Sequence, residues 1–112
     1  MPRILLVEDD PDVSSILTEV LEDAGYEVES SHTLGGGTAL LDNNKYDLVI
    51  ADIGLPDGNG VTLAIRAGER GIPSLIVTGD AQNLRIDAYA VIEKPFRAHA
   101  LLAATRRVLG KI

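Results

Sequence analysis

The chain has 112 residues, a length that suits one domain with its own hydrophobic core, and we expect residues 1–112 to form a single domain. It is 46% hydrophobic and has no cysteine, so an aliphatic core is expected, whereas disulfides, thiolate metal sites and thiol catalysis are excluded. The formal charge of −7 disfavours direct contact with nucleic acid or an anionic membrane and favours a protein partner or a cation.

The chain begins with a pattern typical of a strand followed by a helix. Residues 4–7 are wholly apolar and stop at an acidic run, as a strand buried on both faces does. Asp10 is predicted to cap a helix that has Pro11 at its first position and ends near Gly25. The apolar residues of this amphipathic helix recur at helical spacing: Val13, Ile16, Leu17, Val20, Leu21 and Ala24.

A second strand and a second helix are predicted before the middle of the chain. Residues 26–30 form a weaker strand pattern. Residues 38–41 suggest only a short helix, because the three glycines at 35–37 have a poor helix propensity. Residues 46–51 form another apolar strand pattern, and this one also stops at an acid, Asp52. The pattern of a strand followed by a carboxylate therefore occurs twice.

After Asp52 the chain reads as a turn, a helix and a strand. Residues 55–60 are rich in Pro, Gly, Asp and Asn, which favour a turn. A short helix is predicted at residues 61–67, and a fourth strand at residues 74–77 is closed by Thr78.

The last two predicted elements are a strand and a helix. Residues 89–93 form the fifth strand, which is closed by Lys94. The final helix covers residues 97–109, with Gly110 as its C-cap. The residues predicted to face inward from this helix are Leu101, Leu102, Ala104, Thr105, Val108 and Leu109.

Strands that alternate with helices predict an α/β fold. The expected architecture is a flavodoxin-like three-layer sandwich, in which a five-stranded parallel sheet of order 2-1-3-4-5 is covered on both faces. In such sheets ligands bind outside the carboxyl ends of the strands, where the strand order reverses, between strands one and three. The acids at those two strand ends are therefore expected to be neighbours.

Three carboxylates are predicted to meet at this edge of the sheet. Glu8 and Asp9 follow strand one, and Asp52 follows strand three. Any one of them alone would be a solvated strand end, but crowded carboxylates repel each other unless a hard cation such as Mg²⁺ is bound. Thr78 and Lys94 at two further strand ends strengthen this interpretation, because they add a hydroxyl and an ammonium group around one carboxylate.

The segments ILLVEDD, DLVIADIGLPDGNG, LIVTGD and EKPF, in that order, resemble the response-regulator receiver domain of bacterial two-component signalling. The resemblance covers essentially the whole chain. It implies that Asp52 is the phosphoryl acceptor, and that Glu8, Asp9, Asp52 and the backbone carbonyl of Gly54 hold Mg²⁺. It also implies that Thr78 and Lys94 contact the phosphoryl oxygens.

The resemblance has four further implications. Gly54 and Asp80 lie two residues past Asp52 and Thr78, where they would tune the access of water to the acyl phosphate. A cis peptide bond is expected between Lys94 and Pro95. The phosphoryl donor would be a sensor histidine kinase or a histidine phosphotransfer protein, and an unknown downstream protein would receive the signal. The domain would catalyse its own phosphorylation and dephosphorylation while acting as a signalling protein rather than an enzyme.

The segment between Thr78 and Lys94 departs from the family pattern. It is several residues short of what a complete fourth helix needs, so we expect residues 79–88 to be a loop or at most a turn or two of helix, and the fourth helix to be short or missing. Val91 stands where the family usually has an aromatic residue, and Tyr89 is a candidate for part of that role. Two outcomes stay open: a switch transmitted through this segment, or a simple phosphate relay.

Several conspicuous residues have structural explanations. Asp57 and Asn59 fit turn formers better than metal ligands, and the two histidines, His32 and His99, fit exposed surface positions. Lys94 by itself also fits a structural ion-pair partner of Asp52 or Asp9.

Three alternative functions fit the sequence less well. A pseudo-receiver that signals without phosphate would lack Asp52, Lys94 or the acidic pair. A flavodoxin needs a phosphate loop after strand one, where Glu8 and its acidic neighbours would repel a phosphate. An acid-cluster phosphatase would need a nucleophile pattern that the first strand does not have.

The chain also contains signals about its location and its context. No run approaches the roughly 20 apolar residues that span a bilayer, and residues 1–3 lead directly into a strand and not into a signal-peptide core. We therefore expect a cytoplasmic protein. No output domain follows Ile112, which leaves a stand-alone regulator, a phosphate relay or sink, or a fragment of a longer protein.

Overall fold

A computed structural model describes residues 1–79 and 90–110. Five strands form one parallel sheet of order β2-β1-β3-β6-β7, which confirms the flavodoxin-like order predicted from the sequence. The elements are β1 (Arg3–Val7), α1 (Pro11–Asp23), β2 (Glu27–Ser31), α2 (Leu34–Asn43), β3 (Leu48–Asp52), β4 (Gly54–Leu55), β5 (Gly58–Asn59), α3 (Val61–Glu69), β6 (Ser74–Thr78), β7 (Ala90–Glu93) and α4 (Ala98–Leu109).

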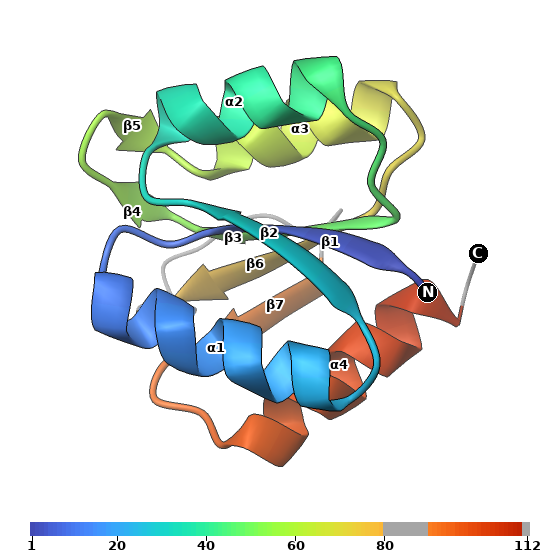
Figure 1. Cartoon of the computed structure of the whole chain (residues 1–112). Helices are drawn as coiled ribbons and strands as arrows, with labels where there is room; N and C mark the ends of the chain where they lie inside the picture. Colours follow the sequence, from blue (N-terminus) through green and yellow to red (C-terminus); the bar gives the residue numbers. More distant parts are fainter. Residues whose placement is uncertain (80–89, 111–112) are drawn as a thin grey trace.

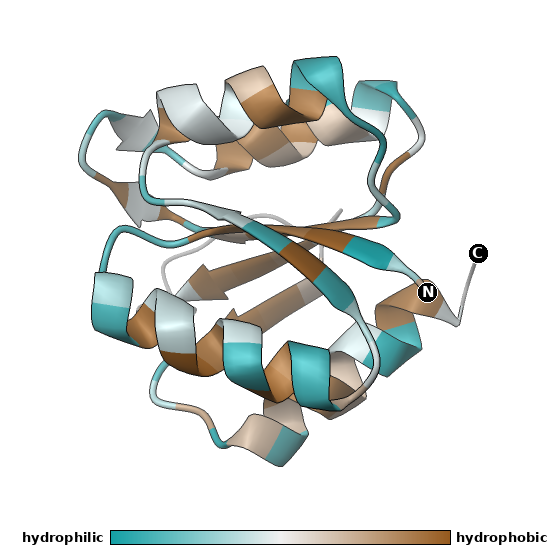
Figure 2. Cartoon of the chain, in the orientation of Figure 1, coloured by the Kyte–Doolittle hydropathy of each residue, from teal (hydrophilic) through white to brown (hydrophobic). Residues whose placement is uncertain are grey.

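The sheet is the middle layer of three. Helices α1 and α4 cover one face, and α2 and α3 cover the other (Figure 1). In β1, Ile4 and Leu6 belong to the core beneath α1 and α4, whereas Leu5 and Val7 belong to the core beneath α2 and α3. Both faces of β1 are thus apolar, and all four of these side chains are almost completely buried. In Figure 2 the central strands are mostly brown, the colour of hydrophobic residues.

Helix α1 confirms the predicted cap. The Asp10 carboxylate accepts hydrogen bonds from the backbone N–H groups of Asp12 and Val13, and Pro11 is the first helical residue. Ile16 belongs to the apolar pattern of this helix but is not buried, because its exposed fraction is 61%. The core-facing stripe of α1 is therefore narrower than the sequence pattern indicates.

Helix α2 is longer than the sequence predicts, since it begins at Leu34 and includes all three glycines. Close packing explains their presence: a Cβ on Gly37 would lie 2.6 Å from Cγ2 of Val7. The hydroxyl of Thr33 caps the helix by accepting from the N–H of Gly36 at 3.0 Å. Tertiary packing and capping thus outweigh the poor helix propensity of glycine.

The shortened segment is only partly described. Strand β6 ends at Thr78 and β7 begins at Ala90, whereas residues 80–89, on which the predicted loop and the role of Tyr89 fall, lie outside the described residues. Val91 lies in β7, where it pairs with Ile76 of β6. The Lys94–Pro95 bond is cis, as expected.

Candidate functional site

The sheet register brings the predicted residues to one edge. Val7 pairs with Ala51 across β1 and β3, so the residues that follow, Glu8 and Asp52, leave the sheet side by side. Asp52 in turn pairs with Val77 of β6, next to Thr78. The register of the apolar strands thus places the polar side chains together at the carboxyl edge of the sheet.

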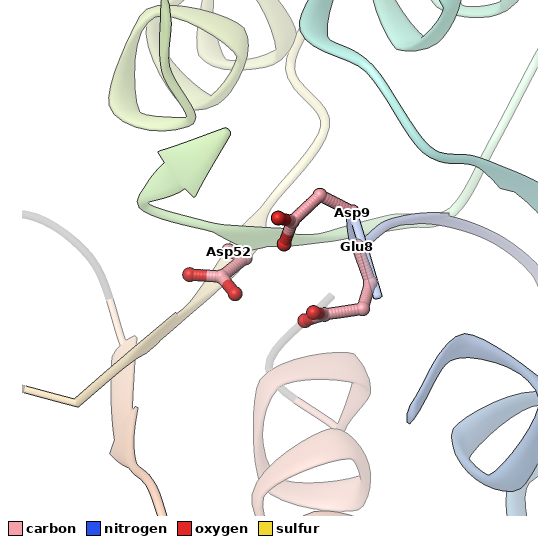
Figure 3. Close-up of side chains that lie close together, drawn as sticks. All are labelled: Glu8, Asp9 and Asp52. Carbon is pink, nitrogen blue, oxygen red and sulfur yellow. The ribbon is translucent and has the colours of Figure 1, made fainter. Parts of the chain in front are cut away.

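The three acids form one cluster. Glu8, Asp9 and Asp52 each offer a carboxylate oxygen, and these oxygens all lie within 4.8 Å of one another. In Figure 3 the side chains of Glu8 and Asp9 extend from the end of β1 toward Asp52. Glu8 is 2% exposed, whereas Asp9 lies at the surface. The side chain of Asp52 is 12% exposed, so it is not fully enclosed.

Lys94 bridges two of these acids. Its Nζ donates to Oδ2 of Asp52 at 2.7 Å and to Oε2 of Glu8 at 3.1 Å. Burial alone would lower the pKa of Lys94, but the hydrogen bonds to Asp52 and Glu8 outweigh burial, so the pKa lies above its usual value. The lysine stays charged, and it is the ion-pair partner of Asp52 and of Glu8 rather than of Asp9.

Glu8 is the acid with the strongest perturbation. Its pKa is raised from 4.5 to about 7, chiefly by burial and in addition by the neighbouring Asp52, while Lys94 acts in the opposite direction. One lysine therefore does not compensate the negative charge of this edge. Such a set of hard oxygen donors fits a small divalent cation, because a cation would relieve the repulsion between the carboxylates.

The loop after Asp52 approaches the site closely. The N–H of Gly54 donates to Oδ1 of Asp52 at 3.1 Å. A Cβ on Gly60 would lie 2.0 Å from the backbone oxygen of Asp52, so only glycine allows this approach. The sequence identified Gly60 as a turn residue and gave no sign of this contact, because the contact depends on how the turn folds back.

Other predicted residues lie as follows. Thr78 is buried at the end of β6, and its carbonyl accepts from the N–H of Lys94 at 2.7 Å, which aligns β6 with the segment that carries the lysine. Asn59 stabilises a local turn, as predicted, because its Oδ1 accepts a hydrogen bond from the N–H of Val61 at 2.8 Å. Asp57 instead reaches α2, a contact that sequence reasoning missed. Asp80 lies outside the described residues.

Known proteins that resemble this chain identify its family. The family described as "Response regulator receiver domain" matches residues 4–106. The chain belongs to this family. Receiver domains are components of two-component systems, and the match extends from the second residue of β1 into the last helix.

Two curated relatives are transcriptional regulators. The chain is 33% identical to "Transcriptional regulatory protein CusR" of Escherichia coli, over 97% of this chain and 52% of the relative. It is 34% identical to "DNA-binding dual master transcriptional regulator RpaA" of Synechocystis, over 99% of this chain and 50% of the relative. The chain thus spans about half the length of these relatives.

Solved structures agree with the fold. A CheY-like response regulator receiver domain from Methanospirillum hungatei is 34% identical and superimposes with a TM-score of 0.89, covering 99% of this chain and 95% of that one. The non-phosphorylated HemR receiver domain from Leptospira biflexa is 37% identical, with a TM-score of 0.84 and coverage of 97% and 94%. In the described part of this chain, no helix has the length and apolar character needed to cross a membrane.

Proposed function

We propose that the chain is a phosphoacceptor receiver domain in which Asp52 accepts a phosphoryl group in a Mg²⁺-dependent reaction. The observation that carries the proposal is the arrangement around Asp52: two further carboxylates lie within reach of one cation, and Lys94 contacts Asp52 at 2.7 Å. Phosphoryl transfer needs this kind of environment, because its catalysis consists mainly of positioning and charge stabilisation.

The transfer step is an in-line displacement. An oxygen of Asp52 attacks the phosphorus of a phosphohistidine, an O–P bond forms and the P–N bond breaks. The electron pair of the P–N bond stays on the imidazole nitrogen, which takes up a proton. Lys94 would stabilise the negative charge on the transferred group, and Thr78 would donate its hydroxyl to a phosphoryl oxygen.

The metal would be held by Glu8, Asp9, Asp52 and the backbone carbonyl of Gly54. When bound, Mg²⁺ supplies the charge neutralisation that lets two anions, the carboxylate and the phosphoryl group, approach each other. The protein contributes fixed oxygen ligands from two strand ends. Hydrolysis of the acyl phosphate by water would reset the domain, and the family resemblance assigns Gly54 and Asp80 the role of tuning the access of that water. The domain thus modifies itself and acts as a signalling protein.

The phosphodonor would be a protein, either a sensor histidine kinase or a histidine phosphotransfer protein in the cytoplasm. An exposed, mainly apolar groove of about 490 Å³ supports a protein donor, because it lies beside Lys94. Its lining residues are Val13, Ile16, Leu17, Lys94, Pro95 and Phe96. The exposed Ile16 would then contact the partner, which gives its position on α1 a function.

The output would be a change in protein–protein interactions. CusR and RpaA are named as transcriptional regulators, and about half of each lies beyond the match. DNA binding in such a protein would belong to a separate region, since the acidic receiver domain itself is a poor partner for DNA.

Mass spectrometry tests the proposal directly. The protein is incubated with acetyl phosphate and Mg²⁺, and the intact mass is compared with that of a sample containing excess chelator. We expect an added phosphoryl group only in the presence of Mg²⁺, located on Asp52. A protein that stays unmodified while signalling to its partner would be a pseudo-receiver, and labelling that persists in chelator would contradict the role of the metal.

A further inference from the structure

The short hairpin after Asp52 is anchored at its base. Strands β4 and β5 pair in antiparallel fashion, with Gly54 opposite Asn59. At the base, the N–H of Gly54 donates to the Asp52 carboxylate at 3.1 Å, and the N–H of Gly60 donates to the carbonyl of Ile53 at 3.1 Å. The hairpin is therefore a direct continuation of the proposed acceptor site.

The hairpin is also anchored at its tip. Oδ1 of Asp57 accepts from the N–H of Leu34 at 2.7 Å, and Oδ2 accepts from the N–H of Gly35 at 2.9 Å. Both N–H groups belong to the first turn of α2, where helical N–H groups have no partner within the helix. The hydrogen bonds from Gly35 and Leu34 lower the pKa of Asp57, so the carboxylate is charged at neutral pH.

Helix α2 connects this anchor to the other half of the acid cluster. Gly37 packs against Val7, the last residue of β1, and β1 carries Glu8 and Asp9 at its end. The contact of Asp57 with α2 thus links the loop after β3 to the strand that supplies the other two acids. The link is made through backbone N–H groups of a helix, which are rigid partners.

We infer that Asp57 is a positioning residue for the acceptor site, and this inference rests on the proposed function. By fixing the tip of the hairpin on α2, Asp57 holds the backbone of Gly54 in the orientation in which its carbonyl joins the metal ligands. Mg²⁺ requires near-ideal octahedral geometry, so a ligand on an unanchored loop contributes less affinity. Mutation of a residue that does not bind the metal but orients a metal ligand typically lowers the metal affinity by about 10- to 100-fold.

The test compares three variants in the full chain. Asp57→Ala removes both hydrogen bonds, and Asp57→Asn keeps one carbonyl acceptor. Thr33→Ala is the matched control, because the Thr33 hydroxyl caps the same helix through Gly36 without contacting the hairpin. Three quantities are measured for each variant: the Kd for Mg²⁺, amide hydrogen exchange at Gly54 in metal-free protein, and the rate of phosphorylation by acetyl phosphate.

We expect Asp57→Ala to weaken Mg²⁺ binding about 10-fold, to speed exchange of the Gly54 amide and to slow phosphorylation to a similar extent. Asp57→Asn should fall between this variant and the wild type, and it decides the matter alone if Asp57→Ala does not fold. Thr33→Ala should bind Mg²⁺ within about 2-fold of the wild type, since its hydrogen bond stays within the start of α2.

Equal effects of Asp57→Ala and Thr33→Ala on the Mg²⁺ affinity and on Gly54 exchange would overturn the inference, because Asp57 would then act only as a helix cap. Failure of the proposed function is distinguishable: the wild type would then remain unphosphorylated, while the metal affinities and the exchange rates would still decide the role of Asp57. A wild type that binds no Mg²⁺ would overturn both proposals.

Discussion

Two clusters of charged side chains in this domain have opposite ratios of acid to base. At the carboxyl edge of the sheet, Glu8 and Asp52 share one cation, Lys94, and Asp9 adds a third carboxylate nearby. The acids outnumber the bases, and the pKa of Glu8 is raised to about 7 by burial and by its neighbour Asp52. The fold therefore holds these groups together at a cost in stability.

Between α2 and α3 the ratio is reversed. Asp42 accepts hydrogen bonds from Nε of Arg66 at 2.8 Å and from Nη2 of Arg66 at 2.7 Å, and it also pairs with Arg70. The hydrogen bond with Arg66 lowers the pKa of Asp42. In this cluster one carboxylate is paired with two arginines. All three side chains are exposed, and their ion pairs join α2 to α3. Of these two clusters, only the acid cluster has more acids than bases, and this contrast supports the cation site that we propose there.

The sharpest test of this contrast is the removal of one acid from each cluster. Asp52→Asn should abolish phosphorylation, because an amide oxygen is a far poorer nucleophile toward phosphorus. The fold should survive, since the change also removes a negative charge next to Glu8. Intact-mass measurement after incubation with acetyl phosphate and Mg²⁺ checks the result, with Asp42→Asn as the control that should be labelled like the wild type. Labelling of the Asp52→Asn protein at the wild-type rate would point to another acceptor.

The other two acids should affect metal binding more than folding. Glu8→Gln and Asp9→Asn each remove a charged oxygen ligand from a site that has few protein ligands, so the affinity for Mg²⁺ should fall at least about 10-fold. Phosphorylation at a fixed Mg²⁺ concentration should fall accordingly. Calorimetric titration with Mg²⁺ measures the affinity, and Asp42→Asn should leave it unchanged. Unchanged Mg²⁺ affinity in both variants would place the metal elsewhere.

The pH dependence of stability should differ between the clusters. Below pH 4.5 Glu8 carries its proton in both the folded and the unfolded chain. Between pH 4.5 and about 7 the unfolded chain ionises Glu8 while the folded protein retains the proton, so the folded state loses stability as the pH rises. Above pH 7 the full penalty is about 3 kcal/mol. Asp42, whose pKa is lowered, acts in the opposite sense, because its contribution is lost as the pH falls.

Urea unfolding at pH 5 and pH 8 in metal-free buffer measures this difference. The wild type should lose more stability than Glu8→Gln between the two values, by most of this penalty, about 2.5 kcal/mol. Mg²⁺ should narrow the gap, because a bound cation favours the ionised carboxylate. Parallel pH profiles for the wild type and Glu8→Gln would show that the glutamate titrates normally.

The sequence predicts the parts of this site that depend on strands. An apolar run followed by an acid places Glu8 and Asp52 at strand ends, and the parallel order then makes them neighbours. Asp10 as a helix cap was equally predictable, because its partners lie two and three residues away. Local patterns were sufficient wherever the partner is local or follows from the strand order.

The remainder depends on contacts that no local pattern encodes. Asp57 bonds to Leu34 and Gly35, which are more than 20 residues away, so the sequence alone indicated only a turn. The glycines of α2 appeared unfavourable for a helix until the contact of Gly37 with Val7 explained them. Ile16 fitted the apolar period but lies exposed. Periodicity predicts which face of a helix turns toward the core, but it does not predict how far the buried part of that face extends.

The smallest expected effect is that of Asp42→Asn on stability. Removing one carboxylate leaves Arg66 and Arg70 without their shared partner, yet all three side chains are well solvated, and exposed ion pairs contribute little to folding. We expect a slight decrease in the urea midpoint at low ionic strength that disappears at high salt, because salt screens exposed charges. Glu8→Gln, measured at pH 8 in the same buffers, should change stability in the opposite direction and keep its effect in high salt, since Glu8 is buried. A loss of stability in Asp42→Asn that is large and insensitive to salt would mean that this cluster also supports the core, and the contrast with the acid cluster would no longer hold.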